Sequence, residues 1–135
     1  MTTISYNQDL GLILSGHPDH MIRTWDPRQK IIQPTILKSH KSWIRQVKWM
    51  NSTKENQSNY QFFSCADDNS CKVWDIRSTI PLHTIVHNIP EVELKQKEKK
   101  WKAPQKVLCG DWSLEGQKKI YTGSSDCTLK RHIYE

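Results

Sequence analysis

The chain has 135 residues, of which 36% are hydrophobic and six are tryptophan. This is enough apolar material for one folded domain and excludes a disordered chain. The longest apolar patch, residues 10–14, is far shorter than the roughly 18 residues that span a bilayer, and the N-terminus has no basic start followed by an apolar core. We therefore expect a soluble, intracellular protein with no membrane contact. The net charge of +6 favours an acidic partner, either nucleic acid or an acidic protein surface.

The N-terminal part of the chain holds the first copy of a repeated pattern. The stretch LSGHPDHMIRTWDPR carries a serine, an aspartate and a tryptophan at spacings that recur later. These positions are Ser15, Asp19 and Trp25. The preceding TTISY, residues 2–6, matches only the end of a segment that opens the later copies. We therefore expect residues 1–38 to form a partial unit that begins inside its first strand.

The second copy, SCADDNSCKVWDIR, repeats the pattern at Ser64, Asp68 and Trp74, each 49 residues after its counterpart. An internal repeat indicates architecture, because a single active site would not be rebuilt in each copy. Short apolar or aromatic runs bounded by turn residues predict strands. These strands are expected at residues 44–49, 61–64, 71–75 and 82–86. Residues 39–86 thus form a complete unit.

A third copy, TGSSDCTLKRHIY, keeps Thr122 at the serine position and Asp126 at the aspartate position, but it has His132 in place of the tryptophan. Upstream of it, KVLCGDW matches the WIRQVKW that opens the second unit. The chain stops soon after the third predicted strand of this copy. Residues 87–135 are therefore expected to form a last unit that lacks its outer strand.

Units of four short antiparallel strands, a repeat of somewhat more than 45 residues and two Trp-Asp dipeptides indicate an all-β protein built as a β-propeller. The chain supplies about three such blades, whereas propellers close with roughly four to eight. We expect an incomplete ring, the C-terminal part of a seven-bladed propeller. The missing blades would come from further sequence or from oligomerisation.

The Trp25-Asp26 and Trp74-Asp75 dipeptides, with His40 and His87 ahead of their strands, resemble WD40 repeats. The resemblance implies a structural hydrogen-bond network, in which the turn aspartate holds the histidine and a serine or threonine links the histidine to the tryptophan. The histidine of the first unit would lie before Met1. In the third unit His132 leaves the network open. The full set is His40, Ser64, Asp68 and Trp74 in the second unit, Ser15, Asp19 and Trp25 in the first, and His87, Thr122 and Asp126 in the third.

Two other kinds of chemistry compete for these residues. The Asp/His/Ser sets imitate a hydrolase triad, but their recurrence favours structure over catalysis. Cys65 and Cys71 flank one turn, yet the corresponding positions of the first unit are not cysteines, and the four cysteines show no zinc-finger spacing. We expect no enzyme activity, no metal and no cofactor.

The longer blocks are more specific. WDPR, the SHKSWIRQVKW block and the KVLCGDW block with its short I-Y tail resemble, in order, the last three repeats of a family of WD-repeat ribosome-biogenesis factors. The resemblance implies a nuclear, nucleolar scaffold in large-subunit assembly and pre-rRNA processing, with pescadillo-type and block-of-proliferation-type protein partners. The alternative is a WD40 peptide-binding module of a ubiquitin-ligase or chromatin complex.

A lysine-rich insertion at residues 88–105 interrupts the third unit. Basic side chains around an aromatic ring suit contact with pre-ribosomal RNA or another partner. A solvated loop that contacts nothing is the competing interpretation. The residues concerned are Lys95, Lys97, Lys99, Lys100, Trp101 and Lys102.

Overall fold

The computed structural model describes residues 1–50, 60–87, 105–113 and 118–133. These residues form three antiparallel sheets, in the orders β1-β2-β3-β4, β5-β6-β7-β8 and β11-β10-β9. The predicted all-β class is confirmed, and the three sheets have the architecture of propeller blades. The strands are β1 (Thr3–Asn7), β2 (Leu12–Gly16), β3 (Met21–Trp25), β4 (Thr35–Lys38), β5 (Ile44–Trp49), β6 (Gln61–Ala66), β7 (Ser70–Asp75), β8 (His83–Val86), β9 (Val107–Ser113), β10 (Lys119–Ser124) and β11 (Leu129–Ile133).

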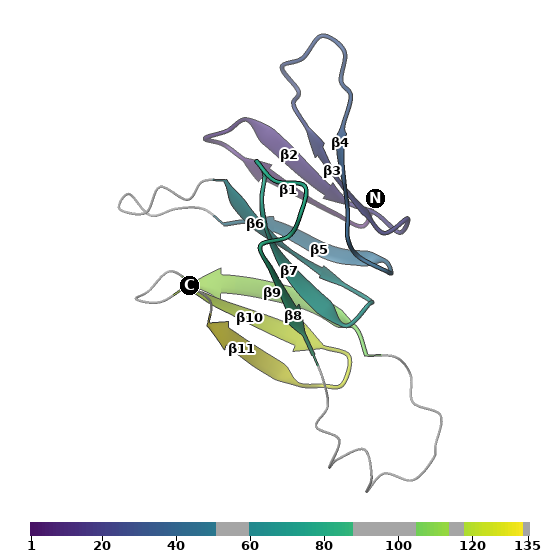
Figure 1. Cartoon of the computed structure of the whole chain (residues 1–135), viewed down its shortest axis with the longest axis vertical. Coiled ribbons are helices and arrows are strands. Elements are labelled where there is room, and N and C mark those ends of the chain that lie inside the picture. Colours follow the sequence, from purple (N-terminus) through teal and green to yellow (C-terminus); the bar gives the residue numbers. More distant parts are fainter. Residues whose placement is uncertain (51–59, 88–104, 114–117, 134–135) are drawn as a thin grey trace, which may run out of the picture.

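The second sheet lies between the other two, as Figure 1 shows along the long axis of the molecule. Its central strands β6 and β7 are therefore buried along nearly their whole length, with Gln61 and Lys72 as the half-buried exceptions. Strand β8, at the outer edge of this sheet, is mostly exposed. Burial thus follows the position of a strand in the stack.

Two apolar cores hold the three sheets together. The first lies between sheets one and two, where the rings of Phe62 and Trp74 stack at 5.9 Å and Trp49 meets Phe62 edge-on at 5.4 Å. The second lies between sheets two and three and includes Phe63 and Ile120. Each of these fully buried side chains stabilises the fold by about 1.5–3 kcal/mol relative to exposure.

The inner edges of sheets two and three are covered by side chains of the preceding sheet. The backbone N–H of Val47 donates to Thr3 Oγ1 at 3.3 Å. Trp49 N–H donates to Ser5 Oγ at 3.2 Å. The N–H of Gly110 donates to Gln46 Oε1 at 2.6 Å. An innermost strand leaves one row of backbone groups unpaired, and these contacts satisfy part of that row.

Three of the four strands predicted in the second unit have different bounds in the structure. Strand β7 begins one residue earlier than predicted, at Ser70, β8 begins one residue later, at His83, and β6 ends later. The first sheet has four strands, and its first strand β1 has 5 residues where β5 has 6. That residues 1–38 form a partial unit stays a prediction. Strand β6 extends two residues beyond the predicted end, because Cys65 and Ala66 also pair with neighbouring strands. The third sheet has three strands among the described residues. The unit boundaries after residues 38 and 86 stay predictions.

Two further predictions concern membrane contact and the lysine-rich insertion. Within the described part of the chain, no helix has the length and apolar character needed to cross a bilayer. Of the lysine-rich insertion at 88–105, only Gln105 is described; its lysines and Trp101 lie outside the described residues.

Candidate functional site

The second sheet brings four predicted residues into one hydrogen-bonded chain. His40, in the segment before β5, has its Nδ1 2.9 Å from Asp68 Oδ2 and its Nε2 2.6 Å from Ser64 Oγ. The indole N–H of Trp74 donates to the same Ser64 oxygen at 2.9 Å. With Nδ1–H donating to the carboxylate, the Ser64 hydroxyl donates to Nε2 and accepts from the indole. These hydrogen bonds thus connect the β6–β7 turn, the segment before β5 and strand β7.

The Asp68, His40 and Ser64 side chains are hydrogen-bonded in the same order as the Asp, His and Ser of a hydrolase triad, but the serine is not accessible to solvent. Ser64 is fully buried, and the Trp74 indole occupies its oxygen. A nucleophile needs a reacting carbon within reach, and the Ser64 side chain has no exposed surface in this fold. The chain of bonds links the β6–β7 turn, the segment before β5 and strand β7.

Asp68 is the acceptor at the centre of the β6–β7 turn. Its Oδ2 also accepts from Lys41 N–H at 2.9 Å, and its Oδ1 accepts from the Ser70 hydroxyl at 2.6 Å and from Ser70 N–H at 3.1 Å. Burial by itself would raise the pKa of Asp68. The hydrogen bonds from His40 and Ser70 outweigh it, so the pKa lies well below its usual value.

The same local turn recurs in all three sheets. The aspartate of each turn accepts from the N–H two residues later: Met21 N to Asp19 at 3.2 Å, Ser70 N to Asp68 at 3.1 Å and Thr128 N to Asp126 at 2.9 Å. The residue after each aspartate has a left-handed backbone, with φ of 70°, 65° and 64°. A short polar side chain that closes such a turn is the physical reason for aspartate at this place. These left-handed residues are His20, Asn69 and Cys127.

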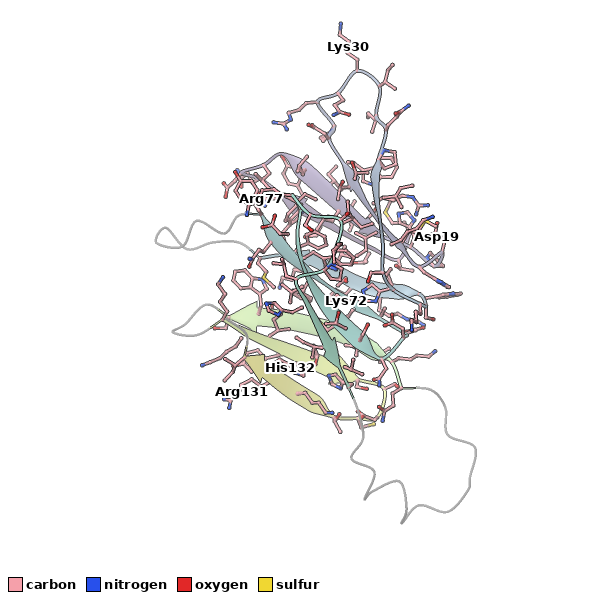
Figure 2. The ribbon with its side chains drawn as sticks, viewed as in Figure 1. Asp19, Lys30, Lys72, Arg77, Arg131 and His132 are labelled. Atoms are coloured by element: carbon pink, nitrogen blue, oxygen red, sulfur yellow. The ribbon has the colours of Figure 1, made fainter. Side chains whose placement is uncertain are left out.

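The first sheet contains a histidine contact that the sequence did not predict. Ser15 Oγ lies 2.8 Å from His17 Nε2 and accepts from Trp25 Nε1 at 2.8 Å. A histidine from the same hairpin thus contacts the serine of the first unit. Asp19 instead pairs with Arg23 at 2.6 Å, at the margin of this sheet (Figure 2). The missed signal was the Ser-Gly-His spacing at the end of β2.

The third sheet keeps the hydroxyl link but not the carboxylate. His87 Nε2 contacts Thr122 Oγ1, which also lies 3.0 Å from Nε2 of His132 (Figure 2). Among the described residues His87 Nδ1 has no hydrogen-bond partner. Asp126 accepts from Thr128 N–H in its own turn and, at 3.4 Å, from Gln105 Nε2 instead. Burial lowers the pKa of both histidines. Two neutral imidazoles therefore replace the histidine and tryptophan of the second sheet.

Cys65 and Cys71 face each other directly across β6 and β7 and are both buried as free thiols. The hydrogen bond to Cys71, followed by burial, raises the pKa of the Cys65 thiol. A raised pKa disfavours the thiolate, which is the form that binds metals. In the described ranges no group of three metal-ligating side chains comes together.

A second cluster, which sequence reasoning missed, lies where sheets two and three meet. Asp67 accepts from Arg45 Nε at 2.7 Å and from Nη2 at 2.6 Å, and Lys106 Nζ lies 3.5 Å from its Oδ2. The Arg45 guanidinium lies 5.5 Å from the centre of the Trp43 ring. The hydrogen bond from Arg45 lowers the pKa of Asp67. We call Trp43, Arg45, Asp67 and Lys106 the junction cluster; the doubled aspartate after Ala66 was its only signal in the sequence.

Comparison with known proteins agrees with this geometry. The model of the WD domain, G-beta repeat, matches residues 32–75, which include the whole second-sheet network. A "Ribosome biogenesis protein WDR12 homolog" of Aedes aegypti is 35% identical over 131 residues, 94% of this chain. The chain carries a WD40 repeat and is homologous to such proteins. The predicted WD40 resemblance is confirmed.

The same name belongs to a Dictyostelium discoideum protein, 40% identical over 88 residues, and to one of Caenorhabditis briggsae, 28% identical over 132 residues. These matches cover 63% and 96% of this chain. The WD40 chain spans only 18% of the Dictyostelium protein and 25% of each of the other two. What the whole relatives do is therefore a matter of proposal for this chain.

Proposed function

We propose that this protein is a non-enzymatic WD40 scaffold in assembly of the large ribosomal subunit and in pre-rRNA processing. The observation that carries the proposal is the similarity to ribosome biogenesis proteins along 94% of the chain in the Aedes aegypti comparison. WD40 blades serve as rigid platforms for other proteins, so the partners are proteins bound on the blade surfaces. Pescadillo-type and block-of-proliferation-type proteins are the proposed partners, and the nucleolus is the proposed location.

The buried network supports a scaffold rather than a catalyst. The histidine, hydroxyl and tryptophan contacts lie inside the sheets, with Ser64 and Thr122 fully buried. They therefore stabilise the blades and leave the surface to carry function. The surface side chains are charged and varied, as suits recognition of other macromolecules.

Contact with pre-ribosomal RNA is a separate part of the proposal. Its support is the net charge of +6 and the lysines of residues 88–105, which surround Trp101 in the sequence. Neutralising phosphates with lysines releases counterions, so binding of this kind weakens steeply with salt. Substituting the five lysines by glutamine should abolish that salt dependence if they contact RNA.

The test of the main proposal is recovery of the tagged full-length protein from its own cells. The expected result is co-purification with large-subunit precursor RNA and with the two types of protein partner, in particles that sediment with the large subunit. Ribonuclease treatment separates partners held by protein contacts from those held through RNA. Recovery with ubiquitin-ligase or chromatin subunits, and without ribosomal precursors, would refute the assembly role and support the peptide-binding alternative.

A further inference from the structure

The junction cluster is a preorganised and accessible group of side chains at the meeting of two blades. The pairing register of β5 shifts between Ile44 and Gln46, so Arg45 stands at an irregularity of the strand. Such bulges re-aim a side chain. Arg45 makes two bonds to Asp67 while its guanidinium carbon lies 5.5 Å from the centre of the Trp43 ring, and Lys106 approaches the same carboxylate from the third sheet. The cluster therefore has a fixed shape before any partner arrives.

Exposure within the cluster is divided between its members. The Asp67 side chain is 7% exposed, whereas Arg45 and Lys106 are 34% and 38% exposed and Trp43 is 49% exposed. The acidic member is thus buried beneath the basic ones. Two cations and one carboxylate leave a net charge of +1 facing outward. The two bonds to Asp67 use Nε and Nη2 of Arg45 and leave the Nη1 group outside this pairing.

We propose that the junction cluster binds an acidic segment of a partner protein. A carboxylate of that segment would accept from Arg45 Nη1 and lie beside Lys106, and an adjacent apolar side chain would pack on Trp43. Charge-assisted bonds to a preorganised guanidinium, next to an exposed aromatic anchor, are the combination that dominates protein interfaces. The inference goes beyond the scaffold proposal, because it depends on these four residues and not on the ribosomal assignment.

A protein segment fits the cluster better than a nucleic acid does. Nucleic-acid binding depends on several neutralised phosphates, whereas this cluster offers a net charge of one. Base stacking needs an open ring face, and Arg45 already lies over the Trp43 ring at 5.5 Å. One or two carboxylates with an apolar neighbour match both the charge and the remaining ring surface.

Site-specific photo-crosslinking tests the proposal in the full-length protein in its own cells. Trp43 is replaced by p-benzoylphenylalanine, which keeps an aromatic side chain at that position, and Ile31, which is 75% exposed in a distant loop, receives the same group as a matched control. The expected product at position 43 is a protein segment rich in Asp or Glu that is absent from the control. The Lys106→Gln variant should lower its yield about tenfold, as expected for loss of one charge-assisted contact. Far-ultraviolet circular dichroism verifies that each variant is folded.

Each remaining outcome would overturn the proposal. These are crosslinks to RNA, crosslinks to a segment without acidic residues, no crosslink specific to position 43, or a yield that the folded Lys106→Gln variant leaves unchanged. Co-purification with ribosomal precursors is scored on the same cells. If the acidic crosslink at position 43 is absent while ribosomal precursors are still recovered, only the inference about the junction cluster is refuted. If the crosslink forms but no precursors are recovered, only the scaffold proposal is refuted.

Discussion

Replacing Asp68 with alanine should destabilise the second sheet more than the equivalent change destabilises either neighbour. Asp68 accepts from four donors: His40 Nδ1, Lys41 N, Ser70 N and Ser70 Oγ. The alanine variant leaves all four without this acceptor. The loss is most severe at His40, because its side chain is only 1% exposed and the other group near its Nδ1, Ser70 Oγ, lies at the longer distance of 3.3 Å.

The expected magnitude follows from these contacts. A buried donor that loses its partner costs about 1–3 kcal/mol, and the two bonds within the turn contribute about 1 kcal/mol between them once water replaces the acceptor. The free energy of unfolding should therefore fall by about 2–4 kcal/mol, a large share of the 5–15 kcal/mol typical of a domain.

Asp126 is the matched control for this experiment. Its carboxylate also accepts from the N–H and the hydroxyl of the residue two positions later, but it makes no bond to His87. Asp126→Ala should therefore cost only about 1 kcal/mol. Urea unfolding followed by tryptophan fluorescence measures both losses, provided that the slope against urea is unchanged. The difference between the two variants isolates the link to the histidine.

The pH dependence gives a second readout of the same carboxylate. The pKa of Asp68 is lowered in the folded state, so its contribution is fully present above the unfolded pKa of about 4 and is lost as the pH falls below that value. Asp68→Ala should flatten the decline in stability below pH 4. Equal losses for Asp68→Ala and Asp126→Ala, or an unchanged acid profile, would refute the argument that the histidine network holds this blade.

Three further changes test other contacts. Gln46→Ala removes the acceptor of Gly110 N–H at 2.6 Å, and urea unfolding should show a loss of about 1–3 kcal/mol. His132→Trp removes an imidazole whose pKa is lowered by burial in the folded state. Protonation of this imidazole below about pH 6.5 favours the unfolded state. The free energy of unfolding should therefore fall less in the variant than in the parent protein when the pH is lowered from about 7 to about 5.5. Gly16→Ala places a Cβ 2.6 Å from Ile44 Cγ2, and thermal unfolding should reveal a loss of about 1–3 kcal/mol.

Each of these three variants has a result that would contradict the reasoning behind it. Lys48→Ala is the control for Gln46→Ala, because Lys48 forms an ion pair with Asp111 in which both side chains are substantially exposed, and it should cost less than about 1 kcal/mol. Equal costs would mean that the bond to Gly110 contributes nothing special. A pH profile of His132→Trp identical to the parent would contradict the neutral-imidazole reasoning, and an unchanged melting temperature for Gly16→Ala would mean that the sheets shift apart at little cost.

The repeat in the sequence was sufficient to predict the fold class and the position of each turn. Turn chemistry is local: an aspartate accepts from the N–H two residues later, so the same letter at a spacing of 49 or 58 residues marks the same backbone conformation. Alternation and aromatic content likewise placed β5 at the observed residues 44–49. These features depend on neighbours in the chain, and the sequence therefore contains them.

Only the tertiary structure decided which side chains meet across the turns. Asp19 and Asp68 stand at equivalent positions, yet one pairs with Arg23 and the other with a histidine 28 residues upstream. Asp67 contacts Arg45 of the second sheet and Lys106 at the start of the third, because these two blades pack together. Such contacts depend on how far a side chain reaches and which blade lies beside it, and neither is encoded in a repeat spacing.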